Sequence, residues 1–405
     1  MKRIVQKYGG SSVATPEHMK NVAQRIRKYR DEGHQMIVVV SAMGGTTDKL
    51  LELAGELNAN PSERELDMLL ATGEQQSVAL MAMALEGMGC EAVSLTGAQA
   101  GIETDGVHSK ARIRNITPDK IEEYLASNKV VLVAGFQGTT TADAITTLGR
   151  GGSDLTAVAL AAVLNADLCQ IFTDVEGVFT ADPRIVPDAQ KVDKMSFDEM
   201  LEMASLGAKV TQSRSIEFAK KFGVDLEVRS SMSEQAGTII TQETKEMEDV
   251  VVRGVSVDKD EAKLTLLKVP DEPGKAATVF SILGDASVNV DMIIQNISAA
   301  GYTDLSFTVP QSDIARVKNE VADDLREAAG VEDIQCDEQI AKVSVIGIGM
   351  RSHSGIAATM FKALADAGIN IEMISTSEIK ISCVIRLDQA DEAVRILHQV
   401  FNLGE

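Results

Sequence analysis

Short apolar runs alternate with longer amphipathic stretches through roughly the first 240 residues. The runs are rich in β-branched residues and almost unbroken, as expected of strands buried on both faces of a parallel sheet. The candidate strands are Arg3–Gln6, Met36–Ser41, Ala92–Leu95, Val130–Ala134, Cys169–Thr173 and Asp225–Arg229. Helical periodicity between them predicts helices at Glu17–Asp31, Ser62–Met88 and Leu155–Asn165. The alternation predicts an α/β fold with an open, mostly parallel sheet sandwiched by helices, whose ligand binds beyond the carboxyl ends of the strands.

A polar, charge-rich stretch at Thr241–Asp249 ends this pattern and is the candidate domain boundary. Beyond it the sequence repeats itself: Gly274–Ile293 aligns without gaps to Gly355–Ile374, and more than half of the positions are identical. Two copies are too few for a solenoid, so the repeat predicts two related small α+β domains.

Each copy has the pattern strand, helix, strand, strand, helix. The first copy predicts Lys263–Val269, Lys275–Ala286, Asn289–Ile297, Thr303–Val309 and Ile314–Ala329, followed by a fourth strand at Asp333–Asp337. The second predicts Lys342–Gly347, Ile356–Ala367, Asn370–Thr376, Lys380–Leu387 and Ala390–Asn402, with no fourth strand of its own.

The alternating segment Val250–Asp258 has no place in the first copy, and an unpaired edge strand is a liability. We therefore expect it to complete the second sheet, which leaves the first small domain inserted inside the second. The predicted domains are residues 1–240, residues 263–337, and residues 250–258 together with 342–405.

Composition excludes some classes of protein but does not identify the function. Of the 405 residues, 44% are hydrophobic and 24% charged, which is typical of a globular protein, and no apolar run is long enough for a membrane span. The N-terminus enters a strand-like run without a signal-peptide pattern, and the four scattered cysteines indicate reduced thiols, so we expect a cytoplasmic protein. A net charge of −21 argues against sequence-independent nucleic-acid binding. Any phosphate site must therefore rely on a few cations placed locally.

Four motifs carry candidate chemistry, and the first, second and fourth of them follow predicted strands. Lys7-Tyr8-Gly9-Gly10-Ser11-Ser12 can present backbone N–H groups and one cation to phosphate, although it can also be a simple glycine turn. The segment from Ser41 to Leu50, SAMGGTTDKL, can bind an anion or cap a helix.

The third motif, Thr147-Leu148-Gly149-Arg150-Gly151-Gly152-Ser153-Asp154, places one arginine among three glycines. Arg150 can form a bidentate contact with a carboxylate, and Asp154 can orient a lysine or hold Mg²⁺. Capping of a helix explains Ser153 or Asp154, but it explains neither Arg150 nor the glycines.

The fourth motif, Phe172 to Arg184, contains two turns, and Lys209 stands in a separate Gly-Ala-Lys-Val segment. Glu74 falls within a predicted helix, where an ordinary solvated glutamate is the default interpretation.

Together these motifs resemble the amino-acid kinase family, and within it the aspartate kinases. The order and spacing of the motifs match, and the repeat is similar to the tandem ACT domains of those enzymes. The resemblance covers essentially the whole chain, and it implies ATP-dependent phosphorylation of the aspartate side chain to 4-phospho-L-aspartate, the first step toward lysine, threonine and methionine.

The resemblance also implies roles for individual residues. Lys7, Asp154 and Lys209 would be catalytic, with Lys7 on the transferring phosphate and Asp154 organising the lysines. The residues implied for ATP are Lys7, Gly9, Gly10, Ser41, Ser153, Thr173, Asp174, Phe179, Arg184, Lys209 and Val210. Those implied for aspartate are Thr47, Glu74, Arg150, Gly151, Gly152 and Ser153, with Glu74 meeting the ammonium group. ATP and Mg²⁺ are the expected cofactors, and no side chain is assigned as the ligand of a resident metal.

For the ACT pair, the resemblance implies an amino-acid effector, lysine, threonine or both, and a homo-oligomer formed through these domains. The implied effector residues are Asp271, Gly274, Asn289, Asp291, Gln295, Thr303, Asn370 and Ile371. We expect Asn289, Asp291 and Gln295 to alternate along one face of a strand, although a solvated sheet edge would have the same pattern. In some relatives an internal start makes a separate regulatory subunit, and Met247 stands where such a start would lie.

Two alternatives stay open. One is a kinase of another acid, such as glutamate or acetylglutamate, which the ACT pair disfavours. The other is a catalytically silent amino-acid sensor, which the intact Lys7, Arg150 and Asp154 disfavour.

Overall fold

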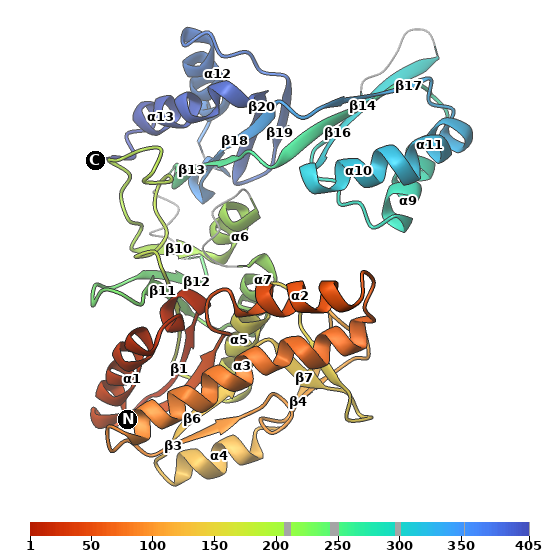
Figure 1. The fold of residues 1–405 in the computed structure, drawn as a ribbon. Coiled ribbons are helices and arrows are strands. Elements are labelled where there is room, and N and C mark those ends of the chain that lie inside the picture. The colour runs from red at the N-terminus through yellow and green to blue at the C-terminus, as the bar shows by residue number, and fades with distance from the viewer. Residues whose placement is uncertain (206–211, 244–250, 296–300, 352, 405) are drawn as a thin grey trace. The chain divides into compact units, whose positions relative to one another are not determined.

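The computed structural model describes residues 1–205, 212–243, 251–295, 301–351 and 353–404. These residues form two compact units (Figure 1). The first unit contains residues 1–178, 191–205 and 212–243, and the second contains residues 179–190 and those described from 251 onward. The predicted boundary at Thr241–Asp249 lies mostly outside the described residues, and the domain bounds stay a prediction.

The first unit is built on an eight-stranded sheet in the order β10-β12-β11-β9-β1-β2-β6-β3. Every neighbouring pair is parallel except β11 with β12. The strands are β1 (Arg3–Tyr8), β2 (Gln35–Val40), β3 (Ala92–Leu95), β6 (Val130–Ala134), β9 (Leu168–Thr173), β10 (Lys194–Ser196), β11 (Leu226–Ser230) and β12 (Thr238–Thr241). The six predicted strands and the mostly parallel sheet are confirmed, and only the short β10 and β12 are additional.

Helices cover both faces of this sheet. They are α1 (Pro16–Asp31), α2 (Thr46–Leu57), α3 (Glu63–Glu86), α4 (Asp119–Ala126), α5 (Gly152–Val163), α6 (Phe197–Ser205) and α7 (Ser213–Phe222). One core cluster joins apolar side chains of α1 and α3 to alternate positions of β1, β2 and β6, while α5 contacts β1, β2 and β9 from the other side (Figure 1). Helix α5 begins three residues earlier than predicted, because Gly151 takes φ +72° at its N-terminus and Gly152 enters the helix.

A second, four-stranded sheet in the first unit was not predicted. Its order is β5-β4-β7-β8, and its strands are β4 (Ile102–Thr104), β5 (Ile113–Ile116), β7 (Gln137–Thr139) and β8 (Ile145–Thr147). Strands of three or four residues are too short to show a hydrophobic period. This small sheet matters for function because β8 leads directly into the arginine-containing glycine loop.

The second unit contains two further four-stranded sheets, each packed with helices. The first has the order β15-β16-β14-β17, with β14 (Glu261–Pro270), α9 (Lys275–Asp285), β15 (Ile293–Gln295), β16 (Tyr302–Pro310), α10 (Ile314–Arg316), α11 (Ala322–Ala329) and β17 (Asp333–Asp337). The second has the order β13-β18-β20-β19, with β13 (Gly254–Asp258), β18 (Ile340–Ile346), α12 (Ile356–Asp366), β19 (Met373–Thr376), β20 (Lys380–Arg386) and α13 (Ala390–Val400).

Strand β13 pairs antiparallel with β18, in the register Asp258 to Lys342 through Gly254 to Ile346. The segment that had no place in the first repeat therefore belongs to the second sheet, as its pattern predicts. Everything from β14 to β17 lies between these two paired strands in sequence.

Two elements predicted for the first repeat are present but differ from the prediction in detail. The strand predicted at Asn289–Ile297 begins only at Ile293, because Asp291 and Met292 each make a single backbone hydrogen bond to Thr308 before the regular ladder starts. The helix predicted at Ile314–Ala329 is interrupted by a π-helical turn at Val317–Val321.

Candidate active site

The glycine turn after β1 packs tightly against the loop after β2. The N–H of Gly44 donates to the carbonyl of Gly10 at 3.1 Å. A Cβ added to Gly10 would lie 2.8 Å from the carbonyl oxygen of Ala42, so only glycine fits. The close approach brings two glycine-rich loops together at the carboxyl edge of the parallel strands, where ligands bind in such sheets.

Lys7 and Asp154 form an ion pair, with 2.6 Å between Nζ and Oδ1. Their side chains are only 13% and 9% exposed, so neither charge is well solvated. Asp154 lies in the first turn of α5 and Lys7 near the end of β1. Two motifs that are far apart in sequence therefore join in one charged centre.

A cavity of about 330 Å³ opens over this pair. Its lining residues are Lys7, Gly10, Ser41, Ala42, Met43, Gly44, Gly45, Thr47, Asp48, Glu74, Phe136, Gly149, Arg150, Gly151, Gly152, Ser153 and Asp154. The first three motifs meet here, together with Glu74 from α3. All six residues that were expected to hold the acid substrate line this cavity.

Glu74 is the least solvated acid of the cavity, with only 4% of its surface exposed. Its Oε1 accepts the N–H of Ala42 at 3.1 Å, and its Oε2 is buried with no hydrogen-bond partner among the described residues. Burial raises the pKa of this carboxyl to about 7. An unpaired buried carboxylate oxygen is costly, and a cation delivered by a ligand would satisfy it.

Arg150 offers the complementary charge. It is exposed at the cavity, and no hydrogen bond or ion pair of its side chain occurs among the described residues. Gly149 and Gly151, on either side of it, both have positive φ. The chain therefore holds a guanidinium, a buried carboxylate and the Lys7–Asp154 pair around one cavity, which suits a ligand with both an ammonium and a carboxylate group.

Phe136 lines the cavity, although the motifs did not single it out. It has φ +69°, which is rare for an aromatic residue, and it follows Gly135 directly after β6. Its place just after a strand is the signal that could have found it.

Several predicted nucleotide residues do not line this cavity. Gly9 lies next to it, since a Cβ there would be 3.5 Å from Nζ of Lys7. Thr173, the last residue of β9, donates its hydroxyl to the carboxylate of the adjacent Asp174 at 3.0 Å. Phe179 and Arg184 belong to the second unit, where Arg184 pairs with Asp182. Lys209 and Val210 lie outside the described residues.

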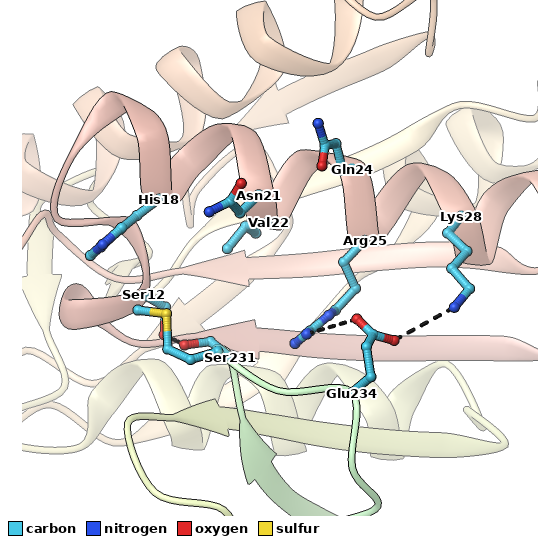
Figure 2. A pocket seen from close by; sticks show the side chains of 10 residues that line it. Ser12, His18, Asn21, Val22, Gln24, Arg25, Lys28, Ser231 and Glu234 are labelled. Carbon is cyan, nitrogen blue, oxygen red and sulfur yellow. Dashed lines mark hydrogen bonds and ion pairs between the residues drawn. The ribbon is translucent and has the colours of Figure 1, made fainter.

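A further cavity of about 380 Å³ lies between α1 and the loop after β11 (Figure 2). Arg25 and Lys28 reach from α1 to the carboxylate of Glu234, at 3.0 and 3.5 Å. Arg25 also donates to the carbonyls of Ser230 and Ser233. Both cations are engaged by the one carboxylate of Glu234, and these contacts anchor the loop to the helix.

In the second unit, a cavity of about 320 Å³ forms at the loop between β14 and α9. It is lined by Val269, Pro270, Asp271, Glu272, Pro273, Gly274, Lys275, Ala276, Gln295, Thr303 and Leu305. Four of the expected effector residues, Asp271, Gly274, Gln295 and Thr303, are therefore together.

The other expected effector residues do not line that cavity: Asn289, Asp291, Asn370 and Ile371. Asp291 instead forms an ion pair with the buried Lys342, which also contacts Glu261 at 3.1 Å. Asn289 and Asp291 precede β15, so they do not alternate with Gln295 along a strand.

No helix among the described residues has the length and apolarity required to cross a membrane.

Comparison with known proteins supplies the family. A model of the Amino acid kinase family matches residues 2–230, and a model of the ACT domain matches residues 268–325 and 343–401. The Aspartokinase of Corynebacterium glutamicum is 52% identical over 410 residues, covering 100% of this chain and 97% of that protein.

Two solved structures of E. coli aspartokinase III agree in fold. The complex with aspartate and ADP is 25% identical with a TM-score of 0.82, covering 98% of this chain and 99% of that one. The complex with lysine and aspartate is 26% identical with a TM-score of 0.79, covering 99% of both chains.

Proposed function

Because this chain belongs to the amino acid kinase family, as an aspartate kinase with two ACT domains, we propose that it transfers the γ-phosphate of ATP to the side-chain carboxylate of L-aspartate, giving 4-phospho-L-aspartate. The observation that carries the proposal is the cavity that joins an unpaired Glu74 oxygen, Arg150 and the Lys7–Asp154 pair. An acid with an α-ammonium group matches that set of charges.

In this mechanism the protein supplies position and charge. A carboxylate is already an anionic nucleophile, so no general base is needed, and the main obstacle is repulsion between two anions. Lys7 would stabilise the transferring phosphoryl group, and the Gly9–Gly10 amides would face its oxygens. Asp154 holds Lys7 in place through their ion pair. Glu74 and Arg150 would bind the ammonium and a carboxylate of aspartate.

Mg²⁺ would enter this site with the phosphates of ATP, whose charge it neutralises. The described residues contain no cluster of three or more His, Cys, Asp or Glu side chains arranged for a metal. Mg²⁺ commonly binds one or two carboxylates plus substrate phosphates, and Asp154 is a carboxylate at the cavity that fits this pattern.

An assay with ATP, Mg²⁺ and hydroxylamine tests the proposal, because an acyl phosphate is trapped as a hydroxamate. We expect product with L-aspartate and little with glutamate or acetylglutamate. Turnover of another acid in preference to aspartate, or of none, would overturn the proposal.

Glu74 should make aspartate binding depend on pH. Its raised pKa of about 7 means that the carboxyl becomes protonated, and loses its charge, as the pH falls below that value. Because only the ionised form attracts an ammonium group, kcat/KM for aspartate should fall ~tenfold per pH unit below about pH 7. A pH profile of kcat/KM measures this, with Glu74→Gln as the control that should lack the inflection. An unchanged inflection in the Gln variant would assign the titration to another group.

We also propose that lysine, threonine or both inhibit the enzyme by binding at the β14–α9 cavity. Support comes from Asp271, Gln295 and Thr303, which line it together, and from the lysine-bound E. coli relative. Inhibition of this kind requires two states whose equilibrium the effector biases.

Gln295→Ala should raise the half-inhibitory effector concentration by about tenfold, which corresponds to roughly 1.4 kcal/mol, and leave uninhibited kcat unchanged. Titration of the variant with lysine and threonine, singly and together, measures this. Gln335→Ala, an exposed amide of the same sheet outside the cavity, is the matched control. Equal inhibition of all three proteins would exclude this cavity.

Homo-oligomerisation through the ACT domains is part of the same proposal. The edge strands β15 and β19 expose Ile293 and Ile374, which occupy equivalent positions in the two repeats. Exposed apolar edges of this kind favour pairing with another chain.

A further inference from the structure

Asp67 is a fully buried carboxylate of the first unit that the proposed chemistry does not use. It lies near the start of α3, and its partners come from two distant segments of the chain. Both of its oxygens accept the N–H of Ser109, at 3.1 and 3.0 Å. Oδ1 also accepts the hydroxyl of Thr147 at 2.5 Å, and Nδ1 of His108 lies 2.7 Å from Oδ2. Such a charge is buried only where several donors compensate for lost hydration.

The contacts of Asp67 connect it to Gly149–Gly152, the arginine loop, which carries Arg150 and lines the cavity. Thr147 is the last residue of β8, three positions before Arg150. Ser109 packs against the same loop, since a Cβ on Gly149 would lie 3.1 Å from the Ser109 carbonyl oxygen. Ser109 has φ +62°, a conformation that needs support from its surroundings. Asp67 thus holds both the strand that leads into the loop and the turn on which the loop rests.

A second tie strengthens this arrangement. Arg214 of α7 donates to the carbonyl of Leu148 at 2.8 Å and to that of Ala111 at 3.0 Å. The N–H of Ala111 donates to the carbonyl of Thr147 at 2.9 Å. The 108–111 segment and the chain before Arg150 are therefore bound to each other as well as to Asp67.

Asp67 and Glu74 stand on the same face of the same helix. Seven residues make almost two full turns of an α-helix, so their side chains project in nearly the same direction. One face of α3 thus provides Glu74, whose Oε2 lacks a partner among the described residues, and, two turns away, the residue that anchors the loop carrying Arg150.

We propose that Asp67 is a positioning residue for substrate binding: through Ser109 and Thr147 it sets the distance between Arg150 and Glu74, and so the length of amino acid that the cavity accepts. This rests on the proposed binding of the amino-acid substrate by Glu74 and Arg150. It predicts a defect confined to that substrate, because the Lys7–Asp154 pair makes no contact with Asp67 among the described residues.

The test is Asp67→Asn, which keeps the shape but loses the charge. We expect KM for aspartate to rise about tenfold or more, KM for ATP to stay within about twofold, and kcat to change little. Glu227→Gln is the control, because Glu227 is also a buried carboxylate of this unit, but it accepts from Gln170 and from the N–H of Gly237 and not from the segments that hold Arg150. A purely structural Asp67 would, like the control, reduce thermal stability and active fraction and leave both KM values unchanged, which would overturn the proposal.

A double-mutant cycle checks that the effect passes through the arginine. In an Arg150→Ala background, Asp67→Asn should add little to the aspartate KM, whereas additive effects would show that Asp67 acts elsewhere. If Asp67→Asn fails to fold, Thr147→Val removes a single donor and should raise the aspartate KM by about threefold or more, and an unchanged value would count against the proposal. The activity of the wild-type enzyme on aspartate is measured in the same experiment. If the wild type does not phosphorylate aspartate, the proposed function fails, and this outcome is distinct from an effect of the Asp67 variants.

Discussion

Replacing Lys7 by alanine should lower kcat by about 10²–10³-fold, the cost typical of losing one preorganised electrostatic donor. Negative charge on the transferring phosphoryl group and its neighbours must be stabilised most strongly in the transition state, so this cation matters more for turnover than for binding. Nucleotide affinity, measured by calorimetry with ADP, should fall by less than about tenfold. Unchanged turnover would exclude the role.

The variant also leaves Asp154 without its partner, and an uncompensated buried carboxylate destabilises the fold. The thermal stability of the variant should therefore be measured together with its kinetics, and kcat should be calculated per folded enzyme. The double variant Lys7→Ala/Asp154→Asn removes the unpaired charge and should recover stability without recovering activity. Lys20→Ala, at an exposed position of α1, is the matched surface control.

Arg150→Ala should raise KM for aspartate by about 10²-fold, because truncating one member of a hydrogen-bonded charge pair costs roughly 2–5 kcal/mol. KM for ATP should change little. Arg150→Lys keeps the charge but cannot make the planar bidentate contact, so its KM should fall between those of the wild type and the alanine variant. Steady-state kinetics with each substrate varied in turn gives both values.

The control for this pair is Arg64→Ala, an exposed arginine of α3 that pairs only with the adjacent Glu65 among the described residues. It should leave both KM values unchanged. If Arg150→Ala affected ATP and aspartate equally, the guanidinium would belong to the phosphate side of the site.

The fold was largely predictable because strands buried on both faces show as nearly continuous apolar runs. The loops after β1 and β2 could be placed from the sequence, because the strands before them are long apolar runs. The Gly149–Gly152 loop could not be placed in this way, because it follows β8, which is too short to predict. Contacts between segments that are distant in the sequence were not predictable. In the sequence, Asp67 has the pattern of a residue on the polar face of an amphipathic helix. The groups that hydrogen bond to its buried carboxylate come from the 108–109 turn and from β8.

Glu74 shows the same limit. From local pattern alone it is an ordinary solvated glutamate, and only the family resemblance gave it a role. Its burial results from the loop after β2: a Cβ on the preceding Gly73 would lie 2.9 Å from Cβ of Ala42, so helix and loop are in close contact there. The hydrophobic periodicity of the α3 sequence does not indicate this contact with the loop.

The register between β13 and β18 has a consequence for how the regulatory half could have arisen. The chain leaves the second sheet after Asp258 and returns to it at Ile340, and Asp258 faces Lys342 across the β13–β18 ladder. A tight turn could therefore join them and restore a plain hairpin, with little cost in loop closure. The outer module would keep all four of its strands, so the inner one could be acquired or exchanged as a cassette without rebuilding its host.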